Sequence, residues 1–419
     1  MKTLKQCLYL CVVLLALSAA ASAQSDFYLK NGDRVVFYGD SITDQRLYTT
    51  FVETYVLTRF PGLNVSFVHS GWGGDRVGGG GGGKIDVRLQ RDVIAYQPTV
   101  MTVMLGMNDA RYRAWDQKIF DEYATGYESI VKTMKAAFPK LRMTLIQPSP
   151  YDDVTQPPKF EGGYNAVLIR YGEFVKELAK REGLDMADLN TSVVAALKRA
   201  GEIDATGAQK IIPDRIHPGA GGHLLMAEAL LRAWKAPSLV TAVEIDASKG
   251  KVVRADNTKA TGLGGEGAIW WMQTDSALPM PLDLNDALLA LAVRSSKVVE
   301  NLNQQSLKIT GLTGPRYALK IDGEEVGAFT KEQLAEGLNL ATLPTPMTRQ
   351  AAAVHALTLK HNNVHFTRWR SVQVPLEKDA PAQARKAMEA LDELEAELIR
   401  QQRAAAQPKP HRYELIPQM

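Results

Sequence analysis

Four short segments of the chain carry residue types that together could perform acyl transfer. They are Gly39-Asp40-Ser41, Ser70 to Asp75, Gly106 to Asp109 and Asp214 to His217. A serine hydroxyl becomes a good nucleophile when an imidazole takes its proton. A carboxylate beside that imidazole fixes its tautomer and stabilises the imidazolium. Ser41 is therefore a candidate nucleophile, His217 a candidate base and Asp214 the carboxylate that orients the base.

Acyl transfer also needs hydrogen-bond donors that are already in place when the oxyanion develops. Each such donor is worth about 3–4 kcal/mol of the barrier, judged from single-donor deletions. The candidates are the backbone N–H groups of Ser41 and Gly74 and the side-chain amide of Asn108. If Ser41 begins a helix, its N–H also lies at the positive end of that helix. This chemistry requires neither a metal nor a nucleotide, so we expect no cofactor.

The elements that must position these segments are strands alternating with helices. Near-continuous apolar runs predict strands at 34–38, 64–69, 99–105, 141–147 and 184–189. Amphipathic stretches between them predict helices, most clearly over 120–138 and 165–181. This alternation predicts a parallel sheet between two layers of helices. Ligands of such sheets bind beyond the carboxyl ends of the strands, where the candidate segments lie.

In order and position, the segments resemble the conserved blocks of the SGNH (GDSL) hydrolase family. The matching residues are Gly39-Asp40-Ser41, Gly74, Gly106-x-Asn108-Asp109 and Asp214-x-x-His217. The resemblance covers about residues 33–234. It implies a flavodoxin-like three-layer α/β/α fold and ester hydrolysis through an acyl-enzyme on Ser41, with His217 as base and Asp214 as its orienter. It also implies an oxyanion hole built from Ser41, Gly74 and Asn108.

Several residues near these segments are expected to shape the site or to contact the substrate rather than to take part in the chemistry. Members of the family often carry Asn where this chain has His69, and we expect His69 to pack at the end of the second strand rather than to act directly in catalysis. Asp40 and Asp109 are expected to organise loops. Tyr151 and Asp152 follow the fourth strand and are candidates for contact with the substrate.

Two further patterns could be mistaken for sites. The six glycines from Gly78 to Gly83 lack the Lys-Ser/Thr of a phosphate-binding loop, and their freedom predicts a mobile loop. His361 and His365 have the spacing of metal ligands on a helix, but no Glu follows His361. We expect both histidines at the surface or between domains.

The amino-terminal residues 1–23 are typical of a secretory signal peptide. Lys2 and Lys5 precede an apolar run from Leu8 to Leu17, and Ala21-Ser22-Ala23 is a cleavage site. The run is too short for stable insertion in a membrane. We therefore expect a periplasmic or extracellular protein.

The amino-acid composition argues against one class of partner and one class of catalytic mechanism. The 49 Lys and Arg residues nearly balance the 46 Asp and Glu residues, a formal net charge of +3, which argues against nucleic acid as a partner. Cys7 and Cys11 are the only cysteines. Because both lie in the signal peptide, thiol catalysis is excluded for the mature chain.

Composition changes after the helix predicted at 219–234, which suggests a hydrolase domain at 24–236 and a C-terminal region at 237–419. Strands are predicted at 240–253, 268–274, 307–309 and 317–321. Asp322-Gly323 predicts a hairpin, Thr330 and Gln333 a capping box, and 347–365 a helix. A charged final helix at about 381–406 either docks on its own chain or forms a homodimer.

The sequence therefore favours a secreted serine esterase for a small acyl group, acetyl in the first place, on a carbohydrate or other small-molecule alcohol. A lysophospholipase or thioesterase is the alternative among enzymes. A non-catalytic glycan-binding protein that keeps the hydrolase fold is the alternative of another class. The complete set of Ser41, Asn108, Asp214 and His217 argues against it, because a binding protein needs none of them.

Overall fold

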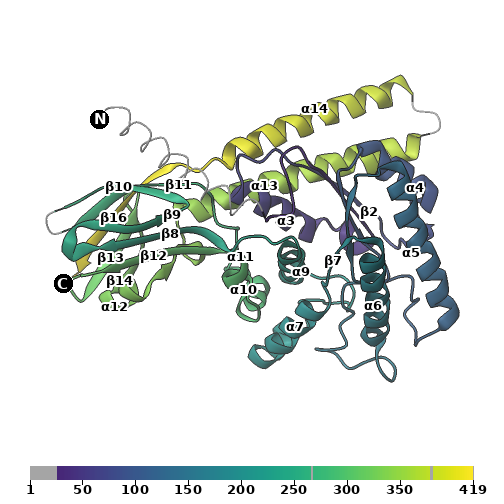
Figure 1. The fold of residues 1–419 in the computed structure, drawn as a ribbon, viewed down its shortest axis with the longest axis horizontal. Coiled ribbons are helices and arrows are strands. Elements are labelled where there is room, and N and C mark those ends of the chain that lie inside the picture. The colour runs from purple at the N-terminus through teal and green to yellow at the C-terminus, as the bar shows by residue number, and fades with distance from the viewer. Residues whose placement is uncertain (1–25, 266–267, 378–380, 419) are drawn as a thin grey trace, which may run out of the picture.

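The computed structural model describes residues 26–265, 268–377 and 381–418 (Figure 1). The predicted signal peptide lies outside these residues. Five parallel strands form the central sheet in the order β2-β1-β5-β6-β7, which is the flavodoxin-like order. Their bounds are β1 (Arg34–Gly39), β2 (Ser66–Gly71), β5 (Val100–Met104), β6 (Arg142–Ile146) and β7 (Asp185–Ala187). All five strands predicted from the apolar runs are present.

Helices cover both faces of this sheet. They are α2 (Ser41–Asp44), α3 (Leu47–Arg59), α4 (Ile85–Asp92), α5 (Gln117–Ala137), α6 (Tyr164–Glu182), α7 (Thr191–Ile203), α8 (Ala205–Ala208) and α9 (Ala220–Ala233). Helices α3 and α9 pack together on one face, and α5 and α6 lie on the other (Figure 1). The predicted three-layer fold is confirmed.

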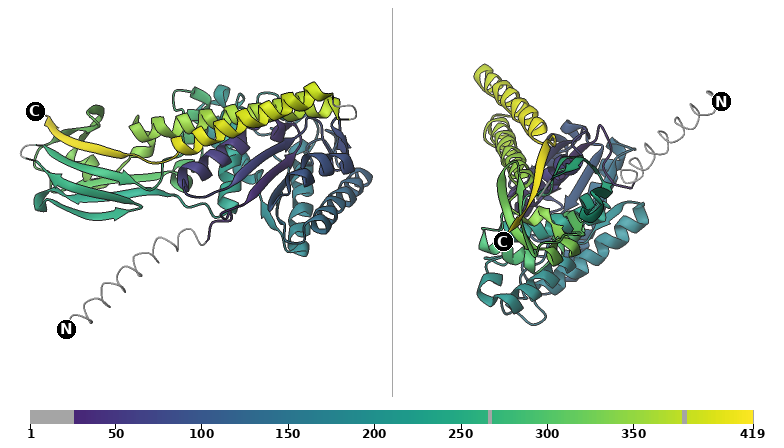
Figure 2. Two further views of the ribbon diagram at one scale, coloured as in Figure 1. Left: turned by 90° about the horizontal axis from the view of Figure 1, so that it is seen from above. Right: turned by 90° about the vertical axis from the view of Figure 1, so that its left-hand side faces the viewer.

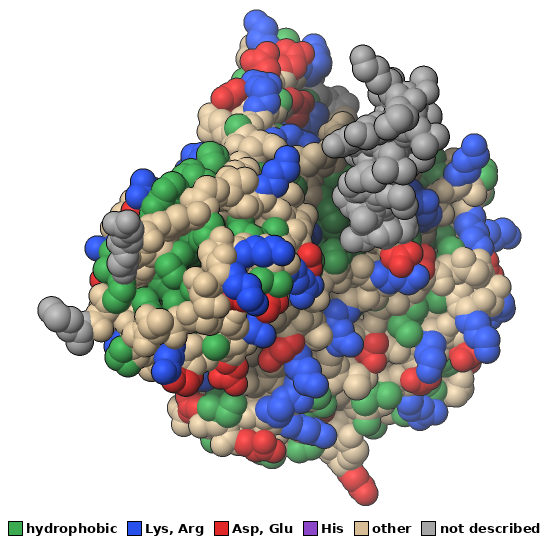
Figure 3. All heavy atoms as spheres, turned by 60° about the vertical axis from the view of Figure 1, so that its left-hand side comes forward, with side chains coloured by type: hydrophobic (Ala, Val, Ile, Leu, Met, Phe, Trp, Pro, Cys, Tyr) green, Lys and Arg blue, Asp and Glu red, His purple; other side chains and the backbone are tan. Residues whose placement is uncertain are grey.

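The C-terminal region begins with two β-sheets packed around a second apolar core. One sheet has the order β15-β12-β8-β9 and the other β10-β11-β16-β13-β14. Their strands are β8 (Leu239–Asp246), β9 (Lys251–Asp256), β10 (Thr258–Gly264), β11 (Ile269–Asp275), β12 (Gln304–Thr310), β13 (Arg316–Ile321), β14 (Glu324–Thr330), β15 (Leu338–Asn339) and β16 (Pro410–Gln418). Trp271, Leu319 and Tyr413 are buried between the sheets. Basic, acidic and apolar side chains are interspersed on the face in Figure 3.

In this region the predicted hairpin and capping box are confirmed, whereas one predicted strand is wrong. Asp322 and Gly323 have φ values of 54° and 83° and join β13 to β14, as the hairpin signal predicts. Thr330 and Gln333 form the predicted capping box at the start of α12 (Lys331–Glu336). The single strand predicted at 240–253 is wrong, because Gly250 turns the chain at φ 57° and separates β8 from β9.

Several C-terminal helices pack against the domain that contains the parallel sheet. Helices α10 (Ala287–Arg294) and α11 (Val298–Leu302) contact α9, and their leucines join the core of the parallel-sheet domain. Helices α13 (Pro346–Phe366) and α14 (Ala382–Ala405) run side by side along the molecule, with α13 on α3 (Figure 2). Because α14 docks on α13 of its own chain, the homodimer stays a prediction. Among the described residues, no helix combines the length and apolar character needed to cross a membrane.

A buried polar cluster joins α13 and α14 to the parallel-sheet domain. Oε1 of Glu53, on α3, lies 2.7 Å from Nε2 of His361 and accepts a hydrogen bond from Gln402 at 3.1 Å. Its Oε2 lies 3.2 Å from Nε2 of His69. Burial alone would raise the pKa of Glu53, but His361 and His69 hold it well below its usual value. Although burial opposes it, the charge of Glu53, with help from Glu395, raises the pKa of His361 to about 10.

This cluster gives His69 and His361 structural roles. Nδ1 of His69 lies 2.6 Å from the hydroxyl of Thr49, so both of its ring nitrogens are occupied away from Ser41. His361 lies between the domains, and His365 packs against Tyr96 and Glu395. In the described part of the chain, no group of three or more His, Cys, Asp and Glu side chains could hold a metal ion.

Candidate active site

Ser41 lies where β1 passes into α2. Gly39 ends the strand, and a side chain there would collide with Thr43 and the carbonyl of Met104. Asp40 caps the helix by accepting the N–H of Ile42 at 3.0 Å. Ser41 is thereby fixed as the first residue of α2.

His217 and Asp214 lie on the turn before α9 and complete a hydrogen-bonded chain to Ser41. Nε2 of His217 is 2.8 Å from Oγ of Ser41, and its Nδ1 is 2.6 Å from Oδ2 of Asp214. Oδ1 of Asp214 accepts the N–H groups of Ile216 and His217 at 2.9 and 2.7 Å. Partial burial alone would raise the pKa of Asp214, but these hydrogen bonds hold it below its usual value. The ionised carboxylate holds the Nδ1 proton of His217, which leaves Nε2 free to accept the serine proton.

The loop after β2 presents one backbone donor to this site. The N–H of Gly73 donates a hydrogen bond to Oδ2 of Asp44 at 3.2 Å. The N–H of Gly74 has no partner among the described residues, nor has that of Ser41. Gly74 adopts φ +77°, a conformation in which any side chain is strained. The free donor is therefore Gly74 rather than Gly73.

Asn108 supplies a side-chain donor that is held from two sides. Its Nδ2 donates to the carbonyl of Asp75 at 3.1 Å, and its Oδ1 accepts the hydroxyl of Tyr112 at 2.8 Å. The second hydrogen of the amide stays available for an oxyanion. Sequence reasoning missed Tyr112, which reaches Asn108 because Arg111 and Tyr112 turn the chain at positive φ.

Replacing Asn108 by Ala should lower kcat for ester hydrolysis by about 10²–10³-fold with little change in KM, since the donor acts on the transition state. Tyr112→Phe keeps the ring and removes only the hydroxyl, so it should cause a smaller loss. Steady-state kinetics of both variants measures the effect. A raised KM with an unchanged kcat would show that Asn108 binds the substrate instead.

Asp40 and Asp109 organise loops, as their positions suggested. Oδ1 of Asp109 accepts the N–H of Val77 at 2.9 Å, whereas its Oδ2 is buried without a partner among the described residues. Burial raises the pKa of Asp109 to about 7, and it raises the pKa of Asp40 to about 7 as well. Asp109 is therefore a carboxyl group whose charged form the fold disfavours.

Asp109→Asn should stabilise the protein more at pH 8 than at pH 5. A carboxyl with a raised pKa contributes its full stability below its unfolded value and loses that contribution as the pH rises through about 7. The amide does not titrate, so the gain should be about 2–3 kcal/mol larger at pH 8. Urea unfolding at both pH values measures it, and an equal change at both would contradict the account.

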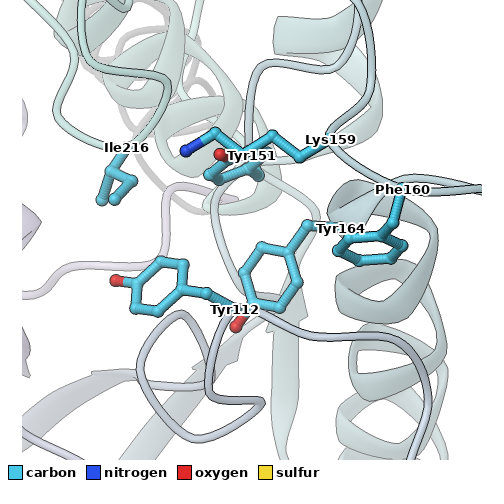
Figure 4. A pocket seen from close by; sticks show the side chains of 6 residues that line it. All are labelled: Tyr112, Tyr151, Lys159, Phe160, Tyr164 and Ile216. Atoms are coloured by element: carbon cyan, nitrogen blue, oxygen red, sulfur yellow. The ribbon is translucent and has the colours of Figure 1, made fainter.

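A small aromatic cleft of about 200 Å³ adjoins the site (Figure 4). Its lining residues are Tyr112, Tyr151, Lys159, Phe160, Tyr164 and Ile216. Tyr112 holds Asn108 and Ile216 precedes His217, so the cleft lies beside both the oxyanion hole and the base. Tyr151, predicted as a substrate contact, forms part of its wall.

For Asp152, the structure gives a different role from the predicted contact with substrate. Its side chain is fully buried. Oδ1 accepts the N–H groups of Val154 and Thr155 at 3.0 and 2.8 Å. Asp152 therefore shapes the loop after β6, because a short carboxylate bonds readily to backbone donors two and three residues ahead.

The glycine run also differs from its prediction. Gly79–Gly80 and Gly83–Lys84 pair as a short hairpin, β3 with β4. Gly82 packs against the ring of Trp72, where a Cβ would collide, and its carbonyl accepts Nη2 of Arg91 at 2.9 Å. Packing against this ring and arginine fixes a segment that lacks side chains of its own.

Comparisons with known proteins agree with this geometry. Residues 37–225 match the GDSL-like Lipase/Acylhydrolase family. An acetylxylan esterase of Geobacillus stearothermophilus is 25% identical in an alignment of 222 residues that covers 48% of this chain and 94% of that protein. The solved structure of BT4096, described as a gut microbial diltiazem-metabolizing enzyme, is 27% identical with a TM-score of 0.81, over 94% of this chain and all of that one.

A second solved structure, the acetyl xylan esterase AlAXEase, is 20% identical with a TM-score of 0.39 and covers 48% of this chain and 98% of its own. The segment that matches the family includes every residue of the Ser41, His217 and Asp214 chain and both Gly74 and Asn108. The domain that contains residues 37–225 belongs to the SGNH (GDSL) hydrolase family, and the chain is a carboxylic ester hydrolase.

Proposed function

We propose that this protein hydrolyses esters of a small acyl group, chiefly acetyl, on a ring-bearing alcohol such as a carbohydrate. The observation that carries the proposal is the Ser41–His217–Asp214 chain opening beside the aromatic cleft. The likeness to an acetylxylan esterase supports the choice of acyl group.

The reaction would proceed in two half-reactions. Oγ of Ser41 attacks the ester carbonyl while Nε2 of His217 takes its proton. The N–H groups of Ser41 and Gly74 and the amide of Asn108 bind the oxyanion. As the intermediate collapses, the C–O bond breaks and His217 gives its proton to the departing alcohol. Water, deprotonated by His217, then attacks the acyl-enzyme and releases the acid and free Ser41.

The aromatic cleft suits the alcohol half of the substrate. The departing oxygen must lie near Nε2 of His217 to receive its proton, and Ile216, which lines the cleft, is the neighbour of His217. Rings of Tyr151, Phe160 and Tyr164 offer flat apolar faces, and the two tyrosines carry a hydroxyl at the ring edge. A sugar or other ring with polar substituents matches this surface.

Release of acid from a panel of esters tests the proposal. We expect p-nitrophenyl acetate to be hydrolysed faster than the octanoate, and acetylated xylan and diltiazem, an acetyl ester, to release acetate. Faster turnover of octanoyl than of acetyl esters would favour the lysophospholipase or thioesterase alternative. Inertness towards every ester would leave only glycan binding.

The alcohol site has its own test. Phe160→Ala should raise KM for acetylated xylose but leave KM for methyl acetate unchanged, because the small alcohol does not reach the cleft. Equal effects on both esters would place the alcohol elsewhere.

We also propose that the protein acts in the periplasm or outside the cell. The support is the pattern of charged, apolar and small residues in positions 1–23. Expression of the full chain followed by fractionation and amino-terminal sequencing should find a product beginning at Gln24 outside the cytoplasm. An uncleaved product in the cytoplasm would contradict export.

A further inference from the structure

We propose that the C-terminal region supplies positioning residues for the oxyanion hole, with Arg370 as the principal one. This inference rests on the proposed function for its kinetic consequence, although its structural part stands alone. Arg370 lies outside residues 37–225, the segment that matches the family. The proposal gives the C-terminal region a part in catalysis without placing any of its atoms on the substrate.

The helix that carries Arg370 changes its form where it reaches the active-site loop. Helix α13 continues into η4 (Thr367–Gln373), a π-helical segment of seven residues. Runs of π-helix are rare and occur often at functional sites, because an extra residue per turn displaces the side chains that follow. Trp369 and Arg370 both lie in this segment and both contact Trp72, in the loop after β2.

Arg370 contacts Trp72 of that loop with the flat face of its guanidinium and Asp44 of α2 with its edge. Its guanidinium carbon is 3.1 Å from the centre of the Trp72 ring, and Nη2 is 3.5 Å from Oδ2 of Asp44. The same Oδ2 accepts the N–H of Gly73 at 3.2 Å. Arg370 thus holds the carboxylate that fixes Gly73, and the next residue along the chain is Gly74.

Trp369 secures the other side of the loop through a buried ion cluster. Its indole N–H donates to Oδ1 of Asp92 at 2.6 Å, and its ring meets Trp72 edge-on at 5.6 Å. Asp92 also accepts a hydrogen bond from Nη1 of Arg88. Nε of Arg88 donates in turn to Oδ2 of Asp75 at 2.7 Å. Because the carbonyl of Asp75 accepts a hydrogen bond from the amide of Asn108, the C-terminal contacts reach two of the three oxyanion-hole donors, Gly74 and Asn108.

The loop needs such support because of its composition. Gly73 and Gly74 give it unusual conformational freedom, and Gly74 must hold φ +77°. Misplacing a catalytic group by about 1 Å can cost about 10²-fold in rate. Arginine suits the task because a planar guanidinium can stack on a ring and pair with a carboxylate at once.

Kinetics of variants at two arginines of one segment, Arg370 and Arg368, test the proposal. Arg370→Met should lower kcat for p-nitrophenyl acetate by about 10–100-fold, within the range set by oxyanion donors, with KM changed less than about twofold. Affinity for a boronic acid that mimics the tetrahedral intermediate should fall by the same factor. Arg370→Lys should recover part of the rate through its charge. Arg368→Met is the matched control, because Arg368 pairs with Asp392 on α14 at 2.9 Å and not with the loop.

Hydrogen exchange of the loop separates this inference from the proposed function. In Arg370→Met, the peptide that contains residues 70–76 should exchange faster than in the wild type, and in Arg368→Met it should not. If the wild type were inert on every ester, the proposed function would fail and the exchange would still decide the structural claim. Unchanged exchange together with unchanged kcat would overturn the proposal. So would equal losses in both variants, which would indicate a general effect on folding.

Discussion

Replacing Ser41 by Ala should lower kcat/KM for p-nitrophenyl acetate by at least about 10⁴-fold. The hydroxyl that forms the acyl-enzyme is lost, whereas the oxyanion donors and the base stay in place, so only a small residual rate should remain. Thermal unfolding should change little, because the side chain of Ser41 is only half-buried and its hydroxyl is hydrogen-bonded to His217. Initial rates over a range of ester concentrations measure the loss.

Ser66→Ala is a matched control for this substitution. Ser66 lies exposed at the start of β2, away from the carboxyl ends of the strands, and its replacement should leave the rate unchanged. If Ser41→Ala kept more than about a tenth of the wild-type rate, Ser41 could not be the nucleophile, because the loss of a nucleophile must slow the reaction far more than tenfold.

Arg88→Met should lower the free energy of unfolding by about 3–5 kcal/mol, the usual cost of removing one partner from a buried ion pair. The side chain of Arg88 is fully buried. It pairs with Asp75 and Asp92 and donates to the carbonyl of Ser70 at 2.8 Å. Methionine has a similar volume but leaves both carboxylates without this cation. Urea unfolding, followed by tryptophan fluorescence, measures the change.

An exposed ion pair provides the comparison for Arg88. Arg181 pairs with Glu128, and both side chains are about half exposed, at 56% and 47%. Arg181→Met should therefore cost at most about 1 kcal/mol. If both substitutions cost the same, burial would not govern the contribution of the Arg88 cluster.

The parallel sheet and the catalytic set could be predicted because both depend on local sequence. A strand covered on both faces must be apolar along its whole length, so runs such as 99–105 stand out without knowledge of their neighbours. Ser41, Asn108 and His217 each follow a strand or precede a helix, and the strand ends of a parallel sheet meet at one rim. The sequence alone therefore places the catalytic segments at one edge of the sheet.

Contacts between distant parts of the chain could not be predicted in this way. Nothing in the sequence near Arg370 distinguishes it from Arg368, yet one pairs with Asp44 and the other with α14. Glu53 lies in an otherwise ordinary helix, and only the folded chain brings His361 to it. Strand β16 was missed because it is placed by its neighbours, β11 and β13, rather than by its own pattern.

Hydrolysis by the proposed mechanism requires that Ser41 itself carry the acyl group during turnover. Acid quenching during turnover of p-nitrophenyl acetate, followed by mass analysis of peptides, looks for that intermediate. We predict one acetyl group on Ser41 itself, formed during turnover, lost when the substrate is exhausted, and absent from Ser41→Ala. Steady hydrolysis by the wild type with the acetyl group on another residue, or with none on Ser41 at any time, would contradict the account.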